Sequence, residues 1–209
     1  MILHVEQTLQ DMYAADFVIR RKGQQVGELA FRGKMSSRDG HWYGSLFNHR
    51  FEEGYDVTIK MGLPSSAYRP YQIYENQSLV GCVYNDTVKE SFFSSYSVGK
   101  LLLHGNDYTM YFIGFGEQGA KNTIYCNGQQ IAVIEKDCVV YNGLYQYRIF
   151  ALDEYSAYAA LFLCTYMYTC GGYNPGVRVT KAVRKATSTT KNKTILATFD
   201  PSFYSRVAE

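Results

Sequence analysis

The stretch from residue 153 to residue 170 constrains the fold of this chain more than any other part of the sequence. It reads Asp-Glu-Tyr-Ser-Ala-Tyr-Ala-Ala-Leu-Phe-Leu-Cys-Thr-Tyr-Met-Tyr-Thr-Cys, with no charge after Glu154. Asp153 is suited to cap a helix, and Gly171-Gly172 is suited to end one. The pattern predicts a helix of about 27 Å. Because apolar or aromatic side chains point all round, this helix has to be buried on every side.

Three surroundings could bury such a helix. The first is a bilayer, but the mostly apolar run 157–170 has only 14 residues, whereas a span needs about 20. The second is an oligomer interface. The third is the inside of a closed β-barrel, and it is favoured because about ten short strands are expected before the helix.

Short strands dominate the rest of the sequence. Residues 17–21, 27–31, 55–61, 71–75 and 107–115 are rich in Val, Ile, Tyr, Phe and Thr. Turn residues separate them at the spacing of an antiparallel sandwich or barrel. Turns are predicted at Asn127-Gly128 and Asn142-Gly143, where Asn and Gly tolerate positive φ, and at 105–107. Residues 195–199 predict a last strand, and Asp200-Pro201 predicts the start of a short helical turn.

An internal repeat supports this interpretation. The segments 17–29, 71–83 and 122–134 each place a polar turn between two half-apolar runs, so each is expected to form one hairpin. Ile19, Ile73 and Ile124 occupy equivalent positions in the three copies. Such units can share one sheet by pairing edge to edge, which leaves few exposed edges.

These hairpins, a late strand Tyr147-Arg-Ile-Phe-Ala-Leu and the apolar helix together resemble the tubby C-terminal-like superfamily. That superfamily includes tubby proteins, phospholipid scramblases and the LURP-one-related proteins with their bacterial relatives. The resemblance covers roughly residues 10–170. It implies a mainly β fold, with a closed antiparallel barrel of 12 strands around a central hydrophobic helix at 153–170. Tubby proteins bind phosphoinositides, but no individual binding residue is carried over. The superfamily pattern also lacks an extension as long as residues 171–209.

The charges of the chain are unevenly distributed. The formal net charge is only +2 over 209 residues. A hydrophobic content of 46% excludes intrinsic disorder. Residues 1–170 carry 14 basic and 17 acidic side chains, whereas residues 171–209 carry seven basic and two acidic ones. We therefore expect a barrel domain at 1–170 and a basic extension at 171–209 that docks on it. The candidate anion-binding or lipid-binding residues of the extension are Arg178, Lys181, Arg184, Lys185, Lys191 and Lys193.

Recognisable catalytic and metal-binding motifs are missing. The five cysteines include no Cys-x-x-Cys pair and are interpreted as small buried hydrophobes; Cys82 or Cys138 could act as a nucleophile only beside a distant histidine. The four histidines, which do not pair at short spacing, are interpreted as surface or loop residues. Gly114-Phe-Gly-Glu-Gln-Gly119 matches a dinucleotide fingerprint, but a strand rather than a helix is expected after it, so a hairpin loop is favoured. No catalytic residue, metal or cofactor is assigned.

The leading functional hypothesis is a non-enzymatic binding module for an anionic partner. Lipid headgroups of a membrane surface are the first candidate, and nucleic acid is a weaker one. The alternatives are a structural or protein-interaction barrel without a ligand and, least favoured, an enzyme. No signal peptide is visible, so a cytoplasmic location is expected, with peripheral membrane association if the lipid hypothesis holds.

Overall fold

Strands make up most of this protein. The structure, a computed structural model, describes residues 1–10, 14–33, 42–53, 61–65, 67–92, 94–136, 139–141, 144–170, 183–185 and 188–207. Twelve strands share one sheet: β1 (Ile2–Gln10), β2 (Ala14–Arg21), β3 (Gln24–Gly33), β4 (Trp42–Leu46), β5 (His49–Glu53), β6 (Tyr68–Glu75), β7 (Ser78–Lys89), β8 (Ser95–Leu103), β9 (Asn106–Tyr111), β10 (Ala120–Cys126), β11 (Gln129–Lys136) and β13 (Gln146–Ala151).

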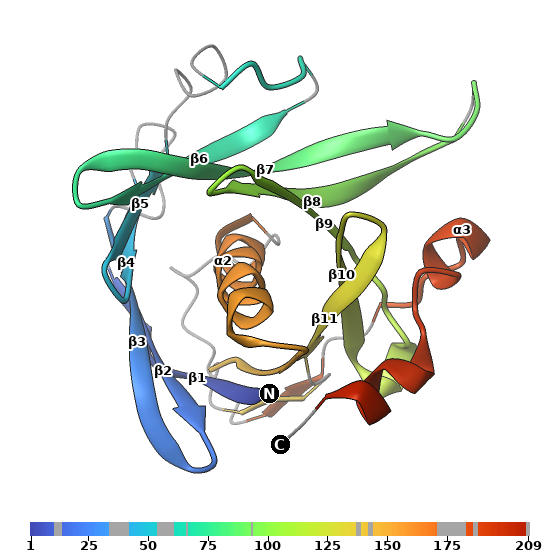
Figure 1. The fold of residues 1–209 in the computed structure, drawn as a ribbon. Coiled ribbons are helices and arrows are strands. Elements are labelled where there is room, and N and C mark those ends of the chain that lie inside the picture. Colours follow the sequence, from blue (N-terminus) through green and yellow to red (C-terminus); the bar gives the residue numbers. More distant parts are fainter. Residues whose placement is uncertain are drawn as a thin grey trace.

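The sheet closes on itself. Each neighbouring pair of strands is antiparallel, and β1 completes the ring by pairing with β2 on one side and β13 on the other. Two short strands, β12 (Val139–Tyr141) and β14 (Val183–Lys185), form a separate two-stranded sheet. The predicted closed barrel of 12 antiparallel strands is therefore confirmed (Figure 1).

Helix α2 (Glu154–Cys170) lies inside the ring of strands (Figure 1). The side chains from Ala159 to Tyr166 are all buried, as is expected of a helix without a polar face. The helix begins where predicted, because the Asp153 carboxylate accepts a hydrogen bond of 2.8 Å from the Ser156 backbone N–H. The barrel wall thus provides the burial that the sequence requires. Within the described residues, no helix combines the length and the apolar character needed to cross a bilayer.

The three predicted repeats form three hairpins of the same design. The turns are Lys22-Gly23, Asn76-Gln77 and Asn127-Gly128, and both residues of each turn have positive φ. The aligned residues Ile19, Ile73 and Ile124 are fully buried, and each pairs across the hairpin with a small residue, namely Gly27, Gly81 and Ala132. In every copy the register shifts directly after the isoleucine, which marks a β-bulge at the same place.

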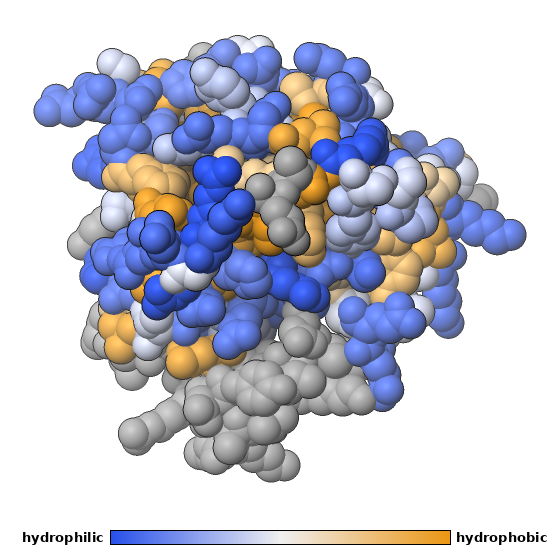
Figure 2. Space-filling model, turned by 60° about the horizontal axis from the view of Figure 1, so that its bottom comes forward, coloured by the Kyte–Doolittle hydropathy of each residue, from blue (hydrophilic) through white to orange (hydrophobic). Residues whose placement is uncertain are grey.

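The two faces of the wall differ in character. Along β2 the side chains of Ala15, Phe17 and Ile19 are buried while the residues between them are partly exposed, which is the alternation of a sheet with one face on a core. Figure 2 shows hydrophilic residues over most of one face of the molecule, with hydrophobic groups in separate patches between them.

The glycine-rich loop between β9 and β10 receives the C-terminal segment. A short 3-10 helix (Gly116–Gln118) forms there, in agreement with the predicted loop and not with a dinucleotide site. The backbone N–H of Gly116 donates to the Ser188 carbonyl at 2.7 Å, and Thr190 donates to the Gly114 carbonyl at 2.9 Å. A Cβ on Gly114 would overlap with Ser188, so a glycine is needed where the two segments cross.

The prediction of a strand at residues 195–199 is wrong. Residues Lys193–Leu196 form the short helix α3, because the Asn192 side chain caps it by accepting a hydrogen bond of 3.1 Å from the Ile195 backbone N–H. The helical turn expected after Asp200 is confirmed as a 3-10 helix (Pro201–Arg206). Its Tyr204 hydroxyl donates to Glu135 of β11 at 2.7 Å.

Other strand and turn predictions differ only locally from the structure. The strand expected at 107–115 ends at Tyr111, and the turn expected at 105–107 lies slightly earlier, at His104-Gly105. Most of the strand predicted at 55–61 and the turn predicted at Asn142-Gly143 lie outside the described residues.

Candidate functional site

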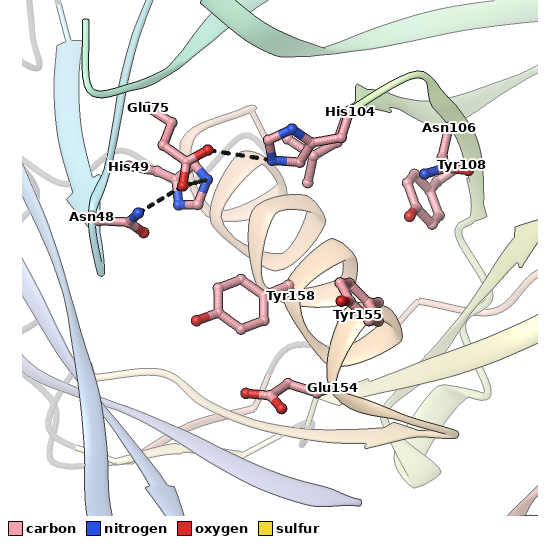
Figure 3. A pocket seen from close by; sticks show the side chains of 10 residues that line it. Asn48, His49, Glu75, His104, Asn106, Tyr108, Glu154, Tyr155 and Tyr158 are labelled. Atoms are coloured by element: carbon pink, nitrogen blue, oxygen red, sulfur yellow. Dashed lines mark hydrogen bonds and ion pairs between the residues drawn. The ribbon is translucent and has the colours of Figure 1, made fainter. Parts of the chain in front are cut away.

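A cavity of about 590 Å³ lies at the end of the barrel where helix α2 begins. Helix α2 fills much of the barrel interior, and this cavity lies beside the start of the helix. The lining comes from the first turns of the helix and from the hairpin turns around it (Figure 3), namely Asn48, His49, Glu75, Leu103, His104, Asn106, Tyr108, Glu154, Tyr155 and Tyr158.

Three side chains, two histidines and one glutamate, converge on one wall of this cavity, and both residue types commonly bind metal ions. His49 on β5 and Glu75 on β6 are direct cross-strand partners, and His104 lies in the turn after β8. The Glu75 carboxylate lies between the two rings (Figure 3), 3.9 Å from Nε2 of His49 and 3.8 Å from Nε2 of His104. The Asn48 side-chain amide donates to the same carboxylate at 2.7 Å and fixes its orientation.

His49 is enclosed by aromatic rings. Its side chain is only 7% exposed, and the Phe162 ring meets it edge to face with centroids 5.3 Å apart. This burial lowers the pKa of His49, so the ring is neutral at neutral pH; the nearby Glu75 carboxylate opposes the shift but is the smaller influence. Burial also raises the pKa of Tyr158, whose ring lies 6.4 Å from that of His49.

The sequence did not predict this group of side chains. The expectation that the histidines are surface or loop residues is correct for His104 but wrong for His49, a buried strand residue. Residues 49, 75 and 104 are far apart in the sequence, so a search for short spacings does not find them. One signal was available: Glu75 directly precedes the turn of the second repeat, and His104 directly precedes the turn predicted at 105–107.

The six basic candidates of the extension are not gathered in the described part of the structure. Arg178 and Lys181 lie outside the described residues. Arg184 and Lys185 belong to β14, where their backbones pair with Val140 and Val139. Lys191 and Lys193 are exposed on either side of Asn192.

The segment around Asn192 is attached to a projecting hairpin. The Asn192 side-chain amide donates to the Glu90 carboxylate at 2.9 Å, and Glu90 lies at the end of the β7–β8 hairpin. That hairpin extends beyond the ring of strands (Figure 1). At its tip the Phe92 side chain is 94% exposed. The hydrogen bond therefore brings exposed lysines to the hairpin that presents an exposed aromatic ring.

The described thiols are poorly suited to nucleophilic chemistry. Cys82 and Cys164 are buried free cysteines, and burial raises the pKa of Cys82 to about 11 and that of Cys164 further still. Both are therefore protonated at neutral pH, whereas the thiolate is the nucleophile. Cys138, the other nucleophile considered from the sequence, lies outside the described residues.

Comparison with known proteins gave no relative. No family model, no curated protein and no solved structure matches the chain. The likeness to the tubby C-terminal-like superfamily accordingly stays a prediction.

Proposed function

We propose that this protein is a non-enzymatic binding module that attaches to an anionic membrane surface through the tip of the β7–β8 hairpin and the adjoining basic segment. The observation that carries the proposal is the 94% exposure of Phe92 beside exposed lysines. An exposed aromatic ring and flexible cations form the combination that suits the boundary between headgroups and acyl chains.

The charges next to this ring support a lipid surface as the partner. Lys191 and Lys193 are both exposed, and so is Lys89 at the end of β7. The hydrogen bond from Asn192 to Glu90 anchors the first two lysines to the hairpin, so they are presented on a fixed scaffold. The anionic surface of the cytoplasmic leaflet attracts each such lysine by about 1 kcal/mol. In this proposal the protein is a peripheral protein of that leaflet.

A lipid surface is favoured over duplex nucleic acid because of Phe92. The phosphate backbone of a duplex would use the lysines alone and leave the ring in water, whereas a lipid interface buries the ring as well. Of the six basic candidates in the extension, Arg178 and Lys181 lie outside the described residues, so the proposal rests on the lysines beside Asn192 and on Lys89.

Co-sedimentation with vesicles tests the proposal. The protein is expected to pellet with vesicles of phosphatidylcholine and phosphatidylserine, and not with phosphatidylcholine alone. The double variant Lys191→Gln/Lys193→Gln should bind about 30-fold more weakly, since two lysines contribute about 2 kcal/mol. Phe92→Ser should also weaken binding.

A charge-matched control is available on another hairpin. Arg21 and Lys22 are exposed at the end of β2, so Arg21→Gln/Lys22→Gln removes the same charge elsewhere on the barrel. This control should keep most of the binding. Equal losses in both double variants would mean that only net charge matters, and the proposed surface would be wrong.

A further inference from the structure

The arrangement of His49, Glu75 and His104 is unusual for a set of simple ion pairs. Neither imidazole reaches the carboxylate at hydrogen-bonding distance, since the closest approaches are 3.9 Å and 3.8 Å. Yet one potential ligand atom from each side chain lies within 4.8 Å of the other two. The three groups surround a common point without bonding to one another.

The state of His49 is the second, independent observation. Its side chain is more than nine-tenths buried, and neither Nδ1 nor Nε2 makes a hydrogen bond of normal geometry among the described residues; the interaction with the Leu46 backbone is only the smallest of the influences on the pKa of the ring. Buried polar side chains in folded proteins nearly always have a partner, and each exception calls for an explanation such as an ion. Nε2 is the nitrogen that lies 3.9 Å from the Glu75 carboxylate, so it is the ring atom on the side of the shared point.

We propose that His49, Glu75 and His104 bind a divalent transition-metal ion, for which Zn²⁺ is the best match. Zinc takes imidazole nitrogens and carboxylate oxygens at about 2.0–2.2 Å, and in a tetrahedral site two such ligands are separated by about 3.4 Å. The spacings of 3.8–4.8 Å therefore contract by at most about 1.5 Å when the ion enters.

The surroundings suit this ion better than a hard cation. Two of the three ligands are imidazoles, whereas Ca²⁺ and Mg²⁺ are held by six or more oxygens. Asn48 already orients the Glu75 carboxylate by its 2.7 Å hydrogen bond, as the outer residues of metal sites do. All three ligands line the cavity, so the fourth coordination position is open to a water or to a ligand that enters from it.

Metal titration of chelator-treated protein tests the site. Calorimetry with Zn²⁺ should show one equivalent bound, and Co²⁺ should give the visible absorption bands of a tetrahedral site without a thiolate band. His104→Gln is the informative variant because the His104 ring is 51% exposed, so its replacement should leave the fold intact. It should weaken Zn²⁺ binding at least tenfold.

Two further variants make the result unambiguous. Glu75→Gln keeps the size of the side chain and should also lose at least tenfold, whereas His4→Gln removes an exposed histidine of β1 and should bind like the wild type. The proposal is overturned if the wild type takes up no Zn²⁺, if His104→Gln binds within tenfold of it, or if Co²⁺ reports thiolate ligation by a cysteine. Since none of these variants lies at the tip of the β7–β8 hairpin, where Phe92 is exposed, vesicle binding by the same proteins is an independent readout.

Discussion

The repeat provides a sharp test of how the barrel is packed, because one substitution has opposite consequences at two equivalent positions. Gly27 and Gly81 both face the buried isoleucine of their hairpin, and the third copy has Ala132 at the same place. A Cβ at Gly81 would overlap with the backbone carbonyl oxygen of Leu102 and lie 3.1 Å from Cα of Leu103. At Gly27 the three atoms nearest to the added Cβ all belong to the ring of Phe47; the closest of them would overlap with it, and none of them is a backbone atom.

The expected magnitudes follow from what has to move. At Gly81 the neighbouring strand backbone must shift, which costs about 3 kcal/mol. Replacing a strand glycine by alanine returns about 0.5–1 kcal/mol, so Gly81→Ala is destabilised by about 2 kcal/mol. In a domain of this size the melting temperature then falls by about 4–8 °C. At Gly27 the Phe47 ring, which is 39% exposed, can rotate away, so stability is unchanged or rises by up to about 1 kcal/mol.

Thermal and urea unfolding of the two variants, followed by circular dichroism, measures the difference. Gly27→Ala is the matched control for Gly81→Ala because both lie in the same kind of hairpin. Melting temperatures of the two variants within 1 °C of each other would refute the argument that backbone contact, and not the glycine itself, sets the cost.

Two further predictions concern the core. Leu163→Asp should prevent folding, since it buries a lone charge at a fully buried position of α2. Tyr155→Asp on the same helix should be tolerated, because Tyr155 is 84% exposed. Circular dichroism measures both, and a native melting curve for Leu163→Asp would contradict the placement of α2 inside the barrel. Because burial raises the pKa of Cys82 from 9.0 to about 11, the folded state keeps a proton that the unfolded chain loses. The contribution of the Cys82 thiol to the free energy of unfolding is fully present below pH 9 and is lost as the pH rises to 11. The total loss is at most about 2–3 kcal/mol. Urea unfolding at pH 8 and pH 11 should show a smaller loss in Cys82→Ala than in the wild type, and equal losses would contradict this assignment.

Local chemistry made much of the fold predictable. The absence of charge after Glu154 required burial on all sides, and Asn127-Gly128 predicted a hairpin turn because these two residues tolerate positive φ. Such signals depend only on residues that are close together in the sequence. Where a local signal competed with another, the prediction failed: residues 195–199 have strand-like composition, but the cap supplied by Asn192 starts a helix just before them.

The candidate sites were decided by tertiary structure. The order of strands round the barrel brings the β5–β6 pair and the turn after β8 to one end, and only this arrangement sets His49, Glu75 and His104 around a common point. In the same way, the hydrogen bond between Asn192 and Glu90 links segments that are remote in sequence. The sequence by itself determined that an apolar helix needs a wall of strands, because burial depends on the composition of one segment. Which polar side chains meet at the end of that wall depends on the pairing of distant strands, which no short stretch of sequence contains.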